Sequence, residues 1–174
     1  APAAPLAPAA PPSPPPAVSE QPVLQRAFSV ASAIFRVNWT VATRKLRSKD
    51  QFAVSPKFEL SFATTCEFKM VIHPTKTSDQ KGGKSFLAAK GKGRVELKCE
   101  TQLASSVEAV LTYRIAVGAG DKRLPPRGPV KHNFTETSVS GLPPEEEEWD
   151  FSAVADEDAH TFVVCLEVLP AGRA

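Results

Sequence analysis

Residues 35–41 read Phe-Arg-Val-Asn-Trp-Thr-Val, and residues 161–168, near the other end of the chain, read Thr-Phe-Val-Val-Cys-Leu-Glu-Val. In the first stretch, apolar side chains alternate with polar ones. This period of two is typical of a β-strand with one buried face. In the second stretch, Val163 and Cys165 make the other face apolar too, which predicts a strand at the centre of a sheet.

Similar segments recur along most of the chain, separated by turns rich in Gly and Pro. The predicted strands span residues 35–43, 58–63, 67–73, 85–89, 94–101, 107–117, 130–135, 149–153 and 161–169. No helical crossovers join them, so a parallel sheet is excluded and an all-β, antiparallel, eight-stranded β-sandwich is expected. The expected core, between two stacked layers, includes Trp39, Phe58, Met70, Leu111 and Leu166.

The N-terminal segment differs in composition from the rest. Residues 1–22 are rich in Pro and Ala, which predicts a disordered linker, with residues 23–170 forming the sandwich domain and residues 171–174 a tail. The first residue is Ala and not Met, so we expect the linker to join this domain to something upstream. Pro11 to Pro16 would also suit an SH3 or WW domain as a polyproline ligand. Apolar positions in residues 23–34 fit a helix slightly better than a strand.

Composition limits the class of protein. A chain of 174 residues, 42% of them apolar, suffices for one domain, and a net charge of +2 gives no overall field that favours nucleic acid or an acidic membrane. Three cysteines cannot all pair within the chain, and each lies in or directly beside a predicted strand, which indicates reduced thiols and an intracellular, cytoplasmic location. We see no signal segment and no apolar run of about 20 residues that would cross a bilayer.

Motifs for catalysis or metal binding are not found in the sequence. Residues 78–85 end like a P-loop, but Ser78 stands where the motif needs Gly, and a strand is predicted where the motif needs a helix. The His and Cys residues lack zinc-site spacing, and the acidic run at residues 145–148 suits a solvated loop. We therefore expect neither an enzyme nor a bound cofactor or metal.

Basic residues crowd one stretch, which we call the basic band. It consists of Lys76, Lys81, Lys84, Lys90, Lys92, Arg94 and Lys98. Such a band could bind phosphate groups of anionic lipid or nucleic acid, or it could keep a hairpin soluble and its edge unpaired. Phosphate-directed binding is the alternative function that the sequence offers.

Several blocks, taken in order, resemble the MATH domain (meprin and TRAF homology). They are residues 37–41, residues 55–60 with Ser-Pro-Lys-Phe, residues 68–74 ending in His-Pro, and Trp149-Asp150-Phe151 followed by residues 162–168. The resemblance spans about residues 35–169. It implies an eight-stranded antiparallel sandwich that binds a short peptide as an added strand, so that backbone hydrogen bonds give affinity and side-chain pockets give selectivity.

The resemblance also implies where a peptide would bind. By position, the site residues are Lys98, Tyr113, His132, Phe134 and Leu142, within or near the segment 138–142. Lys98 stands where the family usually has an aromatic residue, and Tyr113 and Phe134 suit the core equally well. The expected function is a non-enzymatic interaction module for a peptide or partner protein, carried by a larger multidomain protein.

Overall fold

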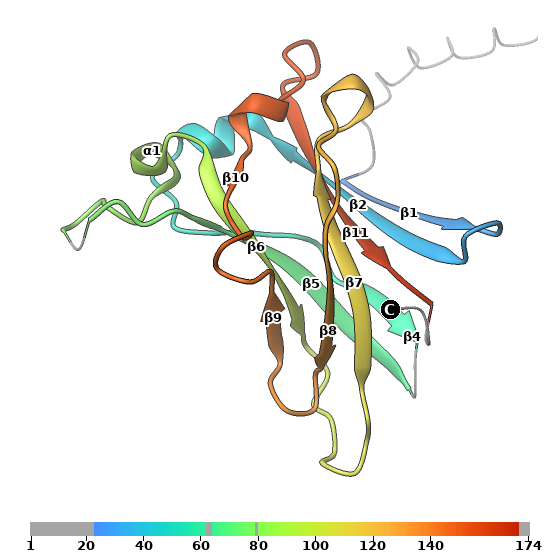
Figure 1. Cartoon of the computed structure of the whole chain (residues 1–174). Coiled ribbons are helices and arrows are strands. Elements are labelled where there is room, and N and C mark those ends of the chain that lie inside the picture. The colour runs from blue at the N-terminus through green and yellow to red at the C-terminus, as the bar shows by residue number, and fades with distance from the viewer. Residues whose placement is uncertain (1–22, 62–63, 79, 171–174) are drawn as a thin grey trace, which may run out of the picture.

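The computed structural model describes residues 23–61, 64–78 and 80–170. These residues form eleven strands in two antiparallel sheets, shown in Figure 1. The predicted linker and tail lie outside the described residues, so the proposed domain limits stay predictions. The five-stranded sheet has the order β1 (Leu24–Ser29), β2 (Ile34–Ala42), β11 (Thr161–Val168), β7 (Val110–Val117), β8 (Arg127–Asn133).

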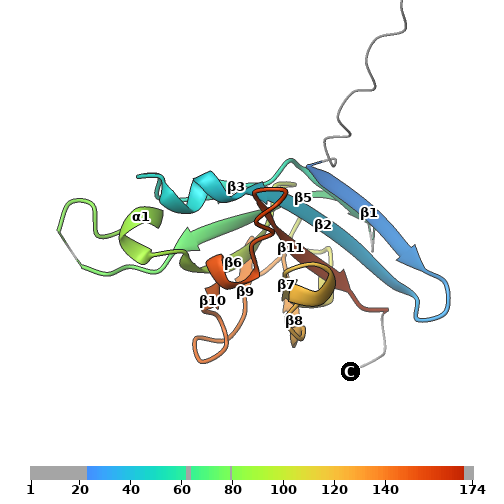
Figure 2. The same ribbon diagram turned by 90° about the horizontal axis from the view of Figure 1, so that it is seen from above.

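The second sheet is built on two long strands, β5 (Thr65–Pro74) and β6 (Lys92–Cys99). Two short strands pair with β5, namely β3 (Ala53–Val54) and β4 (Phe58–Ser61). Two others pair with β6, namely β9 (Val139–Gly141) and β10 (Trp149–Asp150). Figure 2, the view from above, shows β1 and β2 of the first sheet on the right and β6 and β10 of the second on the left.

Helical structure in the described residues is limited to short turns between strands. These are η1 (Thr43–Arg47), α1 (Phe86–Ala89), η2 (Gly120–Lys122) and η3 (Ser152–Val154). Within the ranges that the structure describes, no helix has the length and apolar character needed to cross a lipid bilayer.

The two sheets enclose one apolar core. Trp39, Phe58, Met70, Leu111 and Leu166 are all buried in the same cluster of side chains, as the alternating pattern predicted. Side chains of alternate residues point to the same face of a strand, so each strand contributes a stripe to this core. The all-β antiparallel class is confirmed, although the described chain has eleven strands and not eight.

The last strand is central, as predicted. β11 pairs with β2 on one side and with β7 on the other. Val163 is half-buried and Cys165 is buried on the face away from the core, the face on which Arg123 of the segment after β7 pairs with Glu167. This burial on both faces explains why the strand lacks the alternation seen elsewhere.

The helix expected in residues 23–34 is wrong. Residues 24–29 form strand β1, which pairs with β2 as a hairpin, and Ala33 in the connecting turn has a positive φ of 56°. β1 is an edge strand with most side chains exposed, including Phe28. Since neither face of β1 is buried, its sequence does not alternate between apolar and polar residues with a period of two.

The strand expected at residues 85–89 is also wrong, because residues 86–89 form α1. The Ser85 hydroxyl accepts a hydrogen bond from the amide of Ala88 at 3.1 Å, as an N-cap residue does, and Lys90 ends the helix in the left-handed conformation. A helix thus does follow the P-loop-like residues 78–85. It has only four residues, and Ser78 still occupies the position where the motif needs Gly.

Candidate functional site

Two strand edges meet on one side of the sandwich. β8 pairs only with β7, and β9 pairs only with β6, so each ends its sheet along that side. The two strands follow one another in the chain, joined by residues 134–138, and they lie side by side in both Figure 1 and Figure 2. An edge strand carries backbone groups that a further strand can pair with.

A hydrogen bond ties the sheets together at this place. The Tyr113 hydroxyl, from β7, lies 2.6 Å from the hydroxyl of Ser140 in the middle of β9. Both residues are buried, and burial raises the pKa of Tyr113 to about 12, while the Ser140 hydrogen bond acts in the opposite direction. The two hydroxyl groups therefore fix β9 against the neighbouring sheet.

The register of β9 determines which of its backbone groups point outward. The amide of Cys99 donates to the carbonyl of Ser138, and Leu97 is the partner of Ser140. In an antiparallel ladder, alternate residues direct their amide and carbonyl toward the partner strand. Val139 and Gly141 fall between these positions, so their backbone groups face away from β6, toward the open side of the edge.

The Val139 side chain adds apolar surface to this edge. It is 38% exposed, on the outer face of the sheet, beside its cross-strand partner Lys98. Ser140, between Val139 and Gly141, points the other way and is buried against Tyr113. An incoming strand would therefore meet outward backbone groups, an exposed valine and a lysine.

His132 lies in β8 near the start of the connection to β9. Its ring packs edge-to-face on Phe134, with centroids 4.7 Å apart, and its Nε2 lies 3.0 Å from both the carbonyl and the hydroxyl oxygen of Thr137. Phe134 packs in turn against Phe68 of the core. These contacts order the segment that carries the chain from one edge to the other.

The residues that the MATH resemblance singled out lie in this region, but some of their side chains are buried and others are partly exposed. Tyr113, Phe134 and Leu142 are buried and belong to the core cluster. Lys98 and His132 are partly exposed. Only those two offer side-chain surface, and sequence reasoning named the segment 138–142 without singling out Val139, the exposed apolar residue in it.

The acidic loop beside this edge is tethered to β8. Arg127 stacks over the Trp149 ring, 3.7 Å from the ring centroid, and its Nη1 donates to the carbonyls of Glu146 at 2.9 Å and Glu148 at 2.6 Å. Because a guanidinium combines stacking with several donors, one residue fixes both the tryptophan and the acidic run. Glu148 also accepts a hydrogen bond from Thr75.

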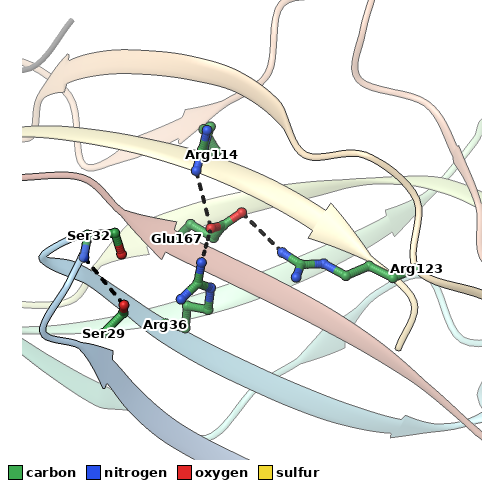
Figure 3. Close-up of polar contacts among 6 residues, drawn as sticks. All are labelled: Ser29, Ser32, Arg36, Arg114, Arg123 and Glu167. Carbon is green, nitrogen blue, oxygen red and sulfur yellow. Dashed lines mark hydrogen bonds and ion pairs between the residues drawn. The ribbon is translucent and has the colours of Figure 1, made fainter. Parts of the chain in front are cut away.

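A second polar feature lies on the outer face of the five-stranded sheet and was not predicted. The Glu167 carboxylate, 1% exposed, forms ion pairs with Arg36, Arg114 and Arg123, as Figure 3 shows. The arginines lie far apart in the sequence, so no local motif joins them. The available signal was Glu167 itself, an acid in line with Val163 and Cys165 on an otherwise apolar face.

The basic band is spread over a loop and the outer face of β6. Lys92, Arg94 and Lys98 alternate with buried residues along β6. Glu96 lies among them, 3.3 Å from Arg94 and 2.8 Å from His73. The charge of the band is therefore partly offset where it crosses the sheet.

The thiols and carboxylates give no metal site in the described residues. Cys66, Cys99 and Cys165 are free and buried, and burial raises the pKa of each, that of Cys165 to about 11. No group of three or more His, Cys, Asp and Glu residues in this part of the chain could hold a metal ion.

Comparison of the chain with protein-family models and with curated proteins finds no match.

Proposed function

We propose that this chain is a non-enzymatic interaction module with a MATH-like sandwich, which binds an extended segment of a partner protein along the β8–β9 edges. The observation that carries the proposal is the outward direction of the Val139 and Gly141 backbone groups, at an edge that pairs with no further strand. A peptide adding to β9 would continue the sheet through these groups, the binding mode known as β-augmentation.

The arrangement of the described strands in two antiparallel sheets around one core supports a MATH-like sandwich, although the strands number eleven and not eight. The blocks that carry the resemblance also fall on or beside strands. Residues 37–41 lie in β2, residues 55–60 end in β4, residues 68–74 lie in β5, Trp149 and Asp150 form β10, and residues 162–168 lie in β11.

The side chains beside the outward backbone groups suggest the kind of peptide. Val139 offers apolar surface and Lys98 a positive charge, and the two are direct cross-strand partners. A residue of the added strand directly opposite Val139 would share its face of the sheet, so an apolar side chain there would pack on Val139, with Lys98 one strand further across the same face.

A proline substitution tests the backbone contact. Selection from a displayed library of random peptides gives ligands of the intact chain, whose affinity is measured by fluorescence polarisation. Val139→Pro removes the outward amide without removing a hydrogen bond to β6, so we expect it to weaken binding about tenfold or more. Val139→Thr keeps the amide and should change affinity far less.

A matched control uses the opposite edge of the molecule. The Thr40 amide of β2 donates to the Val23 carbonyl, so residue 23 directs its backbone groups toward β2. Because this direction alternates along an antiparallel strand, the Arg26 amide of β1 points away from β2. Arg26→Pro therefore makes the same kind of change at another edge and should leave peptide affinity unchanged. Selection without enrichment over scrambled peptides, or equal binding by Val139→Pro and wild type, would refute the proposal.

The alternative function is docking on phosphate groups of anionic lipid or nucleic acid through the basic band. The exposed lysines of the band favour it. The pairing of Glu96 with Arg94, and of Glu100 with Lys69, weighs against it because these acids reduce the local field. Sedimentation with vesicles of anionic lipid and titration of single-stranded oligonucleotides over a range of salt concentrations test this alternative.

We further propose an intracellular setting, in keeping with the expectation from the cysteines. The three buried free thiols support it, because thiols stay reduced in the cytosol. If the chain is isolated from the cytosol in the presence of an alkylating reagent, which labels free thiols, we expect all three cysteines to be labelled.

A further inference from the structure

The arginine cluster follows directly from strand register. Glu167 of β11 is the cross-strand partner of Arg36 in β2 and of Arg114 in β7. Directly paired residues share one face of an antiparallel sheet, so the three side chains form a row across the outer face. Figure 3 shows the row, with Arg123 reaching it from the segment that follows η2.

The cluster carries more positive than negative charge. The Glu167 carboxylate lies 3.1 Å from an Arg36 nitrogen, 3.3 Å from one of Arg114 and 3.2 Å from one of Arg123. Glu167 is buried, whereas each arginine side chain is about one third exposed. One carboxylate among three guanidinium groups leaves an excess of two positive charges at the surface.

The arginines also keep donors that are not used. The Nε atoms of Arg36 and Arg114 are buried and have no hydrogen-bond partner among the described residues. Buried donors in proteins nearly always have an acceptor, so these two Nε atoms call for a partner such as a bound anion or an ordered water. A guanidinium has five donors, and a single carboxylate cannot occupy those of three arginines.

A shallow, open depression of about 390 Å³ lies on the surface at this cluster. It is lined by Arg36, Arg114, Arg123 and Glu167 together with Leu124, Pro125 and Pro126. The amide of Leu124 donates to the carbonyl of Val117 at 2.9 Å, which fixes the segment against the end of β7. The two prolines that follow restrict its backbone, so the wall of the pocket is ordered before any ligand arrives.

We propose that this pocket binds a phosphate dianion, either a phosphate monoester or inorganic phosphate. A dianion matches the excess of two positive charges. Its oxygens can accept hydrogen bonds from several arginines at once, as guanidinium geometry favours. The site lies on the outer face of the sheet and not at the β8–β9 edges, so it is independent of the proposed peptide binding.

In the test, the intact chain is titrated with inorganic phosphate and, separately, with N-acetyl phosphoserine amide. Binding is measured by isothermal titration calorimetry at about pH 8 and constant ionic strength. At this pH a phosphate monoester is a dianion. We expect saturable binding with one site per chain, competition by sulfate and none by chloride. Tighter binding of the phosphoserine compound would identify a phosphorylated side chain as the source, and equal or weaker binding would identify a free phosphate compound.

Arg123→Gln is the diagnostic variant, because Arg123 lies outside the strands and its replacement leaves the ion pairs of Glu167 with Arg36 and Arg114 in place. We expect it to weaken phosphate binding about tenfold or more. Arg44→Gln makes the same change at an exposed residue of η1 and should alter binding less than twofold. Absence of saturable binding, or equal binding by Arg123→Gln and wild type, would overturn the proposal.

A second variant covers the case in which Arg123→Gln fails to fold. Glu167→Gln leaves three guanidinium groups without their carboxylate, so an added dianion should stabilise it more than it stabilises the wild type. We expect its melting temperature to rise more steeply with phosphate concentration than that of the wild type, with no such effect of chloride. Equal slopes for the two proteins would contradict the site.

Discussion

The Tyr113 hydroxyl and the Ser140 hydroxyl lie 2.6 Å apart, and this hydrogen bond joins β7 of one sheet to β9 of the other. Both residues are buried, so neither hydroxyl can exchange its partner for bulk water. An unpaired buried hydroxyl costs about 1–3 kcal/mol. The pair therefore fixes the edge strand that we propose as the peptide site.

Removing the Tyr113 hydroxyl should lower stability and change its dependence on pH. Tyr113→Phe leaves the Ser140 hydroxyl unpaired, which we expect to lower the free energy of unfolding by about 1–3 kcal/mol near neutral pH. Ser140→Ala should lower it by a similar amount. Both values come from urea unfolding monitored by circular dichroism.

The pH dependence has a definite sign. In the folded chain the pKa of Tyr113 is raised from 10.0 to about 12, so between these values the folded state holds a proton that the unfolded state has lost. Stability should therefore fall as pH rises through this window, by at most about 3 kcal/mol from this residue. Tyr113→Phe should lose that part of the decline. An identical decline in the variant would show that Tyr113 does not contribute.

The buried Glu167 should matter more for stability than an exposed acid. Glu167→Gln leaves Arg36, Arg114 and Arg123 facing one another without a counter-charge, and breaking a buried ion pair costs about 3–5 kcal/mol. Since the arginines are partly exposed, we expect a loss near the lower end of that range. Glu67→Gln, at the exposed pair with Lys57, is the control and should change the unfolding midpoint little.

Most of the fold could be predicted from the sequence because most strands bury one face. Period-two alternation located β2, β4, β5, β7 and β11, and the apolar second face of residues 163 and 165 placed β11 at the centre of its sheet. β1 was not predicted because it is exposed on both faces. α1 was not predicted because a helix of four residues is too short to show a helical period.

The candidate sites could be predicted only in part. The resemblance pointed to residues 138–142, which contain the edge strand β9 (Val139–Gly141). It could not show that Val139 and not Tyr113 carries the exposed surface, because burial depends on how the two sheets stack. The arginine cluster depends on the register of three strands separated by many residues, which no local pattern specifies.

Arg127 should hold the acidic loop in place. Arg127→Met removes the guanidinium that stacks on Trp149 and donates to the carbonyls of Glu146 and Glu148. We expect the loop to open more often, so that a glutamate-specific protease cleaves the run at residues 145–148 several times faster. Lys131→Met, at an exposed residue of the same strand, is the matched control. Equal cleavage rates in the two variants would show that Arg127 is not the tether.

The three thiols should be unreactive in the folded chain. Cys66, Cys99 and Cys165 are buried, and burial raises the pKa of each, so little reactive thiolate is present at pH 8. We expect an aromatic disulfide reagent to label almost none of them in native buffer and all three in guanidinium chloride. Rapid labelling of one thiol without denaturant would place that residue at the surface.

Amide hydrogen exchange at Val139 and Gly141 tests the central proposal most directly. Both amides face away from β6, so in the free chain they should exchange faster than the amide of Ser140, the residue between them. Saturation with a peptide selected from the displayed library should slow exchange at Val139 and Gly141, because the added strand accepts their hydrogen bonds. Unchanged exchange at both residues, with protection appearing elsewhere on the molecule, would contradict strand addition at β9.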